Sequence, residues 1–254
     1  MYKEKISVLI PAFNEEEKII TTITETVKVL NGLGNDYEVI IVDDGSKDDT
    51  YEIVLKNLSN FNGRVKIERY VKNMGKGYAI KYGFNFVTGD YILFLDADMD
   101  IHPNQINIFL DLMKKNNTDI VMGSKRHKDS VVDYPLSRKI YSNMYYFLIK
   151  ILFGLPVKDT QTGFKLFRYS SLKNSLSKII IKKYAFDLEL LVVSKIQKCK
   201  IIECPIILKP TRTYYNRIGF KSIMNIILDT MAIFYRFRIL KYYDWSKFWK
   251  FIIY

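Results

Sequence analysis

Short, mostly hydrophobic runs alternate with longer stretches of helical periodicity over the first half of the chain. Each run is bounded by polar or turn-forming residues, a pattern that predicts buried strands rather than helices. The predicted strands cover residues 6–10, 37–42, 65–70, 91–95 and 119–123. Apolar residues three and four apart predict a helix after each of the first four strands. Four strand–helix alternations predict a mostly parallel sheet with helices on both faces, an α/β fold.

The second half of the chain has a different pattern. Residues 136–153 are helical in periodicity and rich in Tyr, Phe, Ile and Leu, and residues 157–165 form a polar loop that enters a short strand. A further helix begins near residue 184, and residues 201–208 read as a late strand. No linker or internal repeat indicates a second independent domain.

The tail from residue 220 onward is amphipathic and ends in a basic and aromatic run. Tyr and Trp favour membrane interfaces, and Lys and Arg favour anionic headgroups, so the tail predicts C-terminal amphipathic helices that lie on a membrane surface. Packing of the same helix on the sheet is the alternative. The apolar stripe is formed by Ile223, Ile226, Ile227, Met231 and Phe234, and the interfacial residues are Trp245, Lys247, Trp249 and Lys250.

Three acidic residues at alternate positions, Asp96, Asp98 and Asp100, follow the strand at 91–95. The carboxyl ends of parallel strands face the crevice in which open α/β sheets bind ligands. Burying unpaired carboxylates costs several kcal/mol, so a divalent cation is the simplest reason for these acids. Hard oxygen ligands suit Mg²⁺ or Mn²⁺, which bridge phosphates. Considered alone, a solvated acidic turn is an equal alternative.

Two further features stand at strand ends. Asp43 and Asp44 follow the second strand directly, whereas Ser46 or Asp48 could serve as the cap of the next helix. After the third strand, Lys76 lies between glycines at a helix start, without the spacing of a P-loop. A lysine in that position can meet a phosphate or an acid.

The net charge of +12 over 254 residues predicts an anionic partner, which could be nucleic acid, an anionic membrane or a phosphorylated substrate. No nucleic-acid-binding motif accompanies the charge, so we expect no nucleic-acid partner. Cys199 and Cys204 form neither a disulfide framework nor a metal motif, which predicts a reducing, cytosolic environment. We expect no signal peptide and no transmembrane helix, because the apolar runs are too short.

Four stretches in order resemble the family-2 glycosyltransferases with the GT-A fold, a nucleotide-sugar-binding α/β domain. They are residues 11–15 (PAFNE), 42–46 (VDDGS) with Asp49 and Thr50, 73–77 (NMGKG) and 96–98 (DAD). In the second half, residues 158–167 (KDTQTGFKLF) and 186–191 (FDLELL) are similar to enzymes that glycosylate polyprenyl phosphates, the dolichyl-phosphate glucosyl- and mannosyltransferases. The resemblance covers nearly the whole chain.

The resemblance implies a GT-A catalytic domain over residues 1–215, with a donor half at about 1–123 and an acceptor half at about 124–215, followed by the tail at 216–254. It also implies a site for the nucleotide sugar. Asp96, Asp98 and Asp100 are then the ligands of Mg²⁺ or Mn²⁺, which stabilises the leaving diphosphate. The donor-binding residues it implies are Pro11, Ala12, Phe13, Glu15, Asp43, Asp44, Gly75, Lys76, Asp96, Ala97 and Asp98.

A lipid phosphate acceptor changes what the site must supply. A sugar hydroxyl needs a general base, whereas a phosphate is already anionic and needs positive charge to bind it beside the donor diphosphate. By motif position, Lys125, Arg138 and Ser142 are the candidate acceptor-phosphate residues. The loop residues that we expect to act at the reacting sugar, together with Asp98, are Asp159, Gln161 and Thr162.

Taken together, these expectations describe a cytoplasmic, peripherally membrane-associated enzyme. It would move a hexose, with inversion, from UDP-glucose or GDP-mannose to a polyprenyl (dolichyl) phosphate. The alternative is a family-2 glycosyltransferase that acts on a soluble sugar or protein acceptor.

Overall fold

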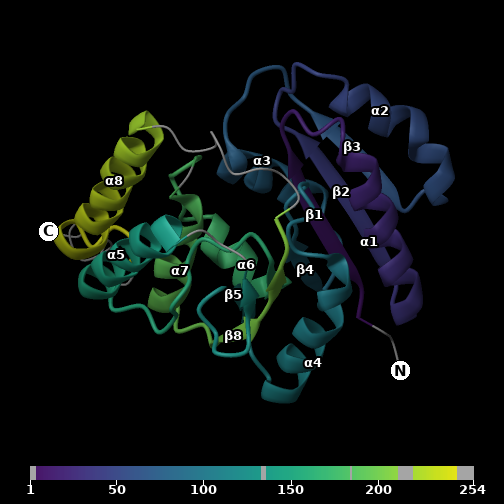
Figure 1. Cartoon of the computed structure of the whole chain (residues 1–254). Helices are drawn as coiled ribbons and strands as arrows, with labels where there is room; N and C mark the ends of the chain where they lie inside the picture. Colours follow the sequence, from purple (N-terminus) through teal and green to yellow (C-terminus); the bar gives the residue numbers. More distant parts are fainter. Residues whose placement is uncertain (1–3, 133–135, 184, 211–219, 245–254) are drawn as a thin grey trace, which may run out of the picture.

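The computed structural model describes residues 4–132, 136–183, 185–210 and 220–244, with the backbone alone for residues 136–141 and 220–223. The first half alternates strands and helices as the sequence predicts (Figure 1). Its elements are β1 (Ile6–Ala12), α1 (Ile19–Leu33), β2 (Tyr37–Asp43), α2 (Thr50–Asn57), β3 (Val65–Arg69), α3 (Lys76–Gly83), β4 (Tyr91–Phe94), α4 (Ile106–Asn116) and β5 (Ile120–Ser124).

The second half adds the remaining elements, and here the predicted late strand is divided in two. Ile206 separates the two parts, and its backbone N–H donates to the Ser130 hydroxyl instead of continuing the sheet. The elements are β6 (Val131–Val132), α5 (Leu136–Phe153), β7 (Lys165–Arg168), α6 (Tyr169–Leu176), α7 (Phe186–Ile196), β8 (Ile201–Pro205), β9 (Ile207–Leu208), α8 (Phe220–Phe234) and a π-helical turn at Tyr235–Ile239.

One seven-stranded sheet carries the fold, in the order β3-β2-β1-β4-β7-β5-β8, and a small sheet pairs β6 with β9. β7 is antiparallel to both β4 and β5, and the other neighbouring strands of the large sheet are parallel. The prediction of a mostly parallel sheet is therefore confirmed. The insertion of β7 at the centre brings the polar loop at 157–165 directly beside the end of β4.

Helices cover both faces of the large sheet, as predicted. Alternate residues of the central strands point to opposite faces, so Leu93 packs with α1 and α4 while Ile92 and Phe94 pack with α3, α6 and α7. A third hydrophobic cluster joins α7 to α5 and α8. The helices α5 and α8 lie side by side at the left of Figure 1. The Phe153 and Phe234 rings meet there with centroids 6.1 Å apart.

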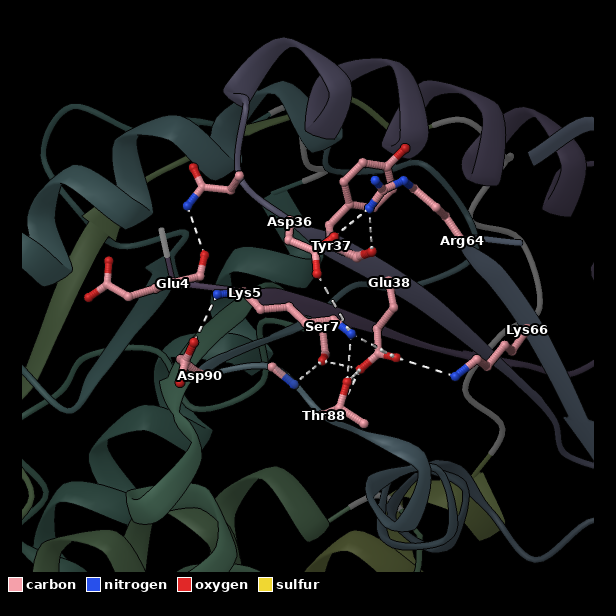
Figure 2. A network of polar contacts seen from close by, with 12 residues as sticks. Glu4, Lys5, Ser7, Asp36, Tyr37, Glu38, Arg64, Lys66, Thr88 and Asp90 are labelled. Atoms are coloured by element: carbon pink, nitrogen blue, oxygen red, sulfur yellow. Dashed lines mark hydrogen bonds and ion pairs between the residues drawn. The ribbon is translucent and has the colours of Figure 1, made fainter. Parts of the chain in front are cut away.

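Buried Glu38 ties three strands together at the end of the sheet opposite the acidic turns (Figure 2). Its Oε1 accepts hydrogen bonds from the Ser7 hydroxyl at 2.7 Å and from the backbone N–H and hydroxyl of Thr88 at 2.7 and 2.8 Å. Lys5 and Lys66 lie 3.7 and 3.5 Å from its other oxygen. Burial alone would raise the pKa of Glu38, but these hydrogen bonds and Lys5 hold it below the ordinary value.

The described part of the tail packs on the domain through a second buried acid, Glu189. One Glu189 oxygen accepts hydrogen bonds from the backbone N–H groups of Ile180 and Ile181 at 3.0 and 2.7 Å. The other accepts from Arg236 at 3.1 Å and from the hydroxyl of buried Tyr243. The packing alternative therefore holds for residues 233–243, while Trp245 and the residues after it lie outside the described part of the chain.

The apolar stripe expected on α8 is shifted from its predicted position. Thr230 and Ile233 face the core because Tyr145 and Phe153 of α5 pack against this side of the helix. The exposed stripe of α8 consists of Met224, Ile227, Leu228 and Met231, and α5 exposes a stripe of the same spacing, Met144, Phe147, Leu148 and Ile151. Across the residues that the structure describes, no helix is long and apolar enough to cross a bilayer.

Candidate active site

A pocket of about 530 Å³, part of it open to solvent, lies at the carboxyl ends of β1, β2 and β4. Every residue that lines it belongs to the predicted donor-binding set: Pro11, Ala12, Phe13, Glu15, Asp44, Lys76, Asp96, Ala97 and Asp98. Gly75 and Asp43, also predicted, lie next to this lining and are not part of it.

The turns after β1 and β2 are bonded to each other, which fixes this wall of the pocket. The backbone N–H of Asn14 donates to the Ser46 hydroxyl at 2.9 Å, and the backbone N–H of Glu15 donates to the Thr50 hydroxyl at 2.8 Å. Asn14 has a positive φ of 55°, which lets the chain turn directly after the strand. Phe13 is consequently held at the surface of the pocket.

The two acids at the end of β2, Asp43 and Asp44, organise the protein around the pocket. Asp43 is buried and forms an ion pair with Arg69, Oδ2 to Nε 3.0 Å. Asp44 accepts hydrogen bonds from the Tyr70 hydroxyl at 2.8 Å, from the Asn73 amide at 3.0 Å, and from the backbone N–H groups of Met74 and Gly75. The Asp44 carboxylate thus holds the loop that leads to Lys76 in place.

Lys76 and Asp96 form an ion pair inside the pocket, with Nζ 2.5 Å from Oδ1. Burial alone would raise the pKa of Asp96, but the ammonium of Lys76 brings it below its ordinary value. Burial alone would lower the pKa of Lys76, but the carboxylates of Asp96 and Asp187 raise it above its ordinary value. Both groups are therefore charged at neutral pH.

The predicted metal ligands separate into two groups. Asp96 and Asp98 both line the pocket, whereas Asp100 does not. The backbone N–H of Asp100 donates to Asp98 Oδ1 at 3.1 Å, and Met99 between them has a φ of 61°, so this segment is a tight turn. Among the described residues, no three His, Cys, Asp or Glu side chains gather as a metal cluster, so the trio Asp96, Asp98 and Asp100 is not such a cluster.

The polar loop before β7 carries a second set of predicted residues, which are not part of the pocket lining. Asp159 is buried and its carboxylate accepts hydrogen bonds from the backbone N–H groups of Lys125 and Gln161, both at 3.0 Å, and from the Thr162 hydroxyl at 2.7 Å. Gly163 lies directly on Asp96, because a Cβ atom there would collide with the Asp96 carboxylate. This loop therefore lies against the acid at the end of β4.

The charge state of Asp159 limits what this residue can do. Burial alone would raise its pKa, but Lys125, whose Nζ is 3.5 Å away, and the Thr162 hydroxyl hold the pKa below its ordinary value. Asp159 is thus a fixed anion at neutral pH and a weak proton acceptor. The Gln161 side-chain nitrogen is buried and has no hydrogen-bond acceptor among the described residues.

A buried ion pair between Lys165 and Asp187 stabilises this loop, and the sequence did not indicate it as functional. Lys165 in β7 is fully buried; its Nζ lies 2.6 Å from Asp187 Oδ1 and also donates to the backbone carbonyl of Thr162. The available signal was a single lysine in a strand whose neighbours are Phe164, Leu166 and Phe167. A charge inside an apolar run implies a buried partner.

The protein-family model described as "Glycosyl transferase family 2" matches residues 7–176, more than half of the chain. The chain belongs to glycosyl transferase family 2. The predicted family is confirmed, and the residues of the pocket and of the loop from Asp159 to Gly163 all lie within the matched segment.

Several curated relatives of this family-2 chain are named dolichyl-phosphate beta-glucosyltransferase. The dolichyl-phosphate beta-glucosyltransferase of Dictyostelium discoideum is 32% identical over 202 residues, 75% of this chain and 62% of the relative. The human protein of the same name is 32% identical over 214 residues, 79% and 66% of the two chains. One from Trichomonas vaginalis is 31% identical over 245 residues, 92% and 75%. The chain thus spans just under two thirds of the first two relatives.

Solved structures confirm the GT-A fold. Glucosyl-3-phosphoglycerate synthase from Mycobacterium tuberculosis, in complex with Mn²⁺, UDP-glucose and phosphoglyceric acid, matches with a TM-score of 0.69 at 20% identity, over 91% of this chain and 79% of that one. The same enzyme with Mn²⁺, UDP and phosphoglyceric acid gives a TM-score of 0.68.

Two of the predicted acceptor residues of this family-2 chain, Arg138 and Ser142, belong to α5, and the third, Lys125, follows β5. Lys125 is turned toward Asp159, whereas Ser142 is exposed and accepts a hydrogen bond from Arg126 at 2.8 Å. Arg126 also donates to Asn143 at 2.6 Å and lies over the Tyr146 ring, 4.9 Å from its centroid. Arg138 belongs to α5, but its side chain is outside the described part of the structure.

Proposed function

We propose that this protein transfers a hexose from a nucleotide sugar to a polyprenyl phosphate, with inversion, at the cytoplasmic face of a membrane. The observation that carries the proposal is the pocket at the ends of β1, β2 and β4, which is lined by Asp96, Asp98 and Lys76; the loop that carries Asp159 packs on Asp96 through Gly163. The curated relatives named dolichyl-phosphate beta-glucosyltransferase support the acceptor class. UDP-glucose and GDP-mannose are the candidate donors.

A divalent cation, Mg²⁺ or Mn²⁺, fits the residues present. Such ions are commonly held by one or two carboxylates together with substrate phosphates rather than by an all-protein cage. Asp96 and Asp98 supply two carboxylates in one pocket, and the remaining ligand positions would go to the donor diphosphate and water. The ion would supply Lewis-acid stabilisation of the leaving diphosphate. Asp100 would contribute through its backbone N–H, whose hydrogen bond to Asp98 stabilises the turn that carries this carboxylate.

The protein's own residues have separate tasks in this scheme. Phe13, Pro11 and Glu15 form the wall that would receive the nucleoside, with Asp43 and Asp44 fixing the loops around it. Gly75 and Lys76 would face the diphosphate. On the other side, Asp159, Gln161 and Thr162 would orient the sugar. The buried nitrogen of Gln161 lacks an acceptor among the described residues and could donate to a sugar hydroxyl.

The acceptor phosphate would bind beside α5, at Lys125, Arg138 and Ser142, and we add Arg126 to this proposed set because it contacts Ser142. Within the described part of the chain, the contacts of Arg126 are neutral groups, Ser142, Asn143 and Tyr146, so its positive charge is available to an anion. Lys125, by contrast, is paired with the buried carboxylate of Asp159. A lipid phosphate is already anionic, which agrees with the weak basicity of Asp159.

The exposed stripes of α5 and α8 are the proposed membrane contact. Each stripe places four large apolar side chains at spacings of three and four residues, as on the lipid-facing side of an interfacial helix. They adjoin the proposed phosphate site, because the Tyr146 ring, over which Arg126 lies, is 5.3 Å from the ring of Phe147 in the exposed stripe of α5. A polyprenyl chain anchored in the bilayer could then present its phosphate to Arg126. The tail from residue 245 would add aromatic and basic contacts.

The test is a panel of nucleotide sugars incubated with polyprenyl phosphate and Mn²⁺ or Mg²⁺, followed by extraction into organic solvent. We expect labelled sugar in the lipid phase with one donor. Label that appears only in the aqueous phase, on a soluble sugar or protein, would favour the alternative acceptor. No transfer from any donor would refute the proposed activity.

A further inference from the structure

The carboxylate of Asp96 is enclosed on two sides within the pocket. Lys76 Nζ lies 2.5 Å from Oδ1, and the backbone of Gly163 covers the Oδ2 side so closely that a side chain could not fit there. Negative charges of Asp98 and Asp187 also act on the Lys76 ammonium. In this arrangement, Lys76 occupies the position in which a cation would meet Asp96.

Lys76 is held where it is by backbone as well as by charge. It is the first residue of α3, and the preceding Gly75 has a φ of 96° and packs against the carbonyl of Lys182. Asp44 fixes the same turn through the N–H groups of Met74 and Gly75. The Cα of Lys76 is therefore fixed, while its side chain is about one-third exposed and can swing within the pocket.

We propose that Lys76 is an exchangeable counter-ion that couples cation loading to donor binding. Without the donor, Lys76 neutralises Asp96 and opposes binding of a divalent cation. When a nucleoside diphosphate arrives, its phosphates offer Lys76 an alternative anionic partner, and Asp96 becomes available to the cation. By thermodynamic reciprocity, cation and nucleotide must then strengthen each other's binding by the same factor. This inference rests on the proposed function, because it assumes a diphosphate-containing donor.

The experiment measures Mn²⁺ binding directly, by electron paramagnetic resonance of free Mn²⁺, without substrate turnover. Wild-type protein should bind Mn²⁺ weakly alone and at least tenfold more tightly with saturating UDP or GDP. Lys76→Met should bind Mn²⁺ alone at least tenfold more tightly than wild type and should show weaker coupling to nucleotide, with only the part that comes from diphosphate ligands to the cation remaining. Lys76→Gln serves as a second variant, and circular dichroism verifies that each variant is folded.

Two control comparisons test whether Lys76 opposes Mn²⁺ by its direct contact with Asp96 or only through the positive charge that it adds to the pocket. Lys125 also acts electrostatically on Asp96 but forms its ion pair with Asp159, so Lys125→Met should change Mn²⁺ affinity less than threefold. In an Asp96→Asn background, Lys76→Met should give no gain, because the contested carboxylate is absent. Unchanged Mn²⁺ affinity in Lys76→Met, or an equal gain in Lys125→Met, would overturn the inference.

The outcome is distinguishable from failure of the proposed function. If neither UDP nor GDP binds, the proposed donor class is wrong, while the Mn²⁺-only comparison of wild type with Lys76→Met still decides whether Lys76 opposes the cation. If nucleotide binds cooperatively with Mn²⁺ but no lipid product forms, only the acceptor assignment is refuted.

Discussion

The proposed donor side of this molecule, around the pocket, and the proposed acceptor side, around α5 and α8, use their charged residues in contrasting ways. Around the donor pocket, acids are paired inside the protein: Asp43 with Arg69, Asp96 with Lys76, and Asp159 with Lys125. Around α5 and α8, apolar side chains are exposed, and Arg126 contacts neutral groups among the described residues. A prearranged pocket suits a small, highly charged donor, whereas an open apolar and basic surface suits a lipid phosphate. The two sides meet at α7, whose first turn carries both Asp187 and Glu189.

The largest expected effect is on stability, at the place where the tail joins the domain. Glu189→Ala should lower the free energy of unfolding by about 3–5 kcal/mol, because it leaves the partly buried Arg236 guanidinium and two backbone N–H groups unpaired. Urea unfolding followed by circular dichroism measures this. Glu25→Ala, which removes surface contacts with Lys28 and His102 from a partly exposed side chain, should change stability by less than about 1 kcal/mol. Equal effects of the two would mean that the tail is not anchored by Glu189.

The second prediction separates the two acids of the turn after β4. Asp98→Asn should reduce transfer a hundredfold or more, at least about 3 kcal/mol of transition-state stabilisation, because it removes a pocket carboxylate that we assign to the cation. Asp100→Asn should cost much less, since Asp100 is outside the pocket lining. Initial rates at saturating Mn²⁺, with thermal melts of both variants, provide the test. An Asp98→Asn enzyme with half of the wild-type rate would exclude the assignment.

The sequence predicts features that depend on local patterns better than features that depend on contacts between distant segments. The strand-end residues of the donor pocket follow from local patterns, since a hydrophobic run that stops on acids fixes where those acids lie in a parallel sheet. The position of β7 between β4 and β5 does not follow from such a pattern, because an antiparallel insertion depends on which strand edges are free. Lys165 with Asp187, and Glu189 with Tyr243, are pairings between distant segments, so no local periodicity indicates them.

On the proposed acceptor side, the orientation of neighbouring side chains could not be predicted from the sequence. Motif position favours Lys125, yet the structure turns Lys125 toward Asp159 and places Arg126 beside Ser142. Which of two adjacent side chains faces α5 is decided by the turn after β5, where the Lys125 N–H is bound by Asp159. The shift of the exposed stripe on α8 has a similar cause, because packing against α5 determines which face is covered.

The third prediction tests the proposed membrane face. Ile151, 79% exposed on α5, should contact lipid, so Ile151→Glu should weaken binding to anionic vesicles tenfold or more, in line with about 1.5–3 kcal/mol for burying such a side chain. Leu55→Glu is the matched control, because Leu55 is an exposed apolar residue on α2, on the opposite side of the molecule (Figure 1). Co-sedimentation measures both. Equal losses for the two variants would place the membrane contact elsewhere.

The fourth prediction distinguishes Arg126 from its neighbour. Arg126→Gln should raise KM for polyprenyl phosphate about tenfold, roughly the 1.4 kcal/mol of one charge-assisted contact, and leave KM for the donor unchanged. Lys125→Gln should lower kcat in addition to its effect on KM for polyprenyl phosphate, because it also removes the partner of Asp159. Steady-state kinetics with each substrate varied in turn gives the comparison. Acceptor KM values that are unchanged in Arg126→Gln would assign the phosphate to other residues.

The smallest expected effect concerns the end of the donor half that is farthest from the pocket. The hydrogen bonds to Glu38 in Figure 2 hold its pKa below the ordinary value of 4.5. A carboxyl whose folded-state pKa is depressed contributes stability that is fully present above the unfolded pKa and is lost as the pH falls through the folded pKa. This contribution should therefore be constant from pH 8 to about 5.5 and decline below about 4.5, by at most about 1.4 kcal/mol per pH unit. Urea unfolding at several pH values should show the stability difference between wild type and Glu38→Gln shrinking on acidification. A difference for Glu38→Gln that grew as the pH fell would show that the folded protein prefers the protonated acid.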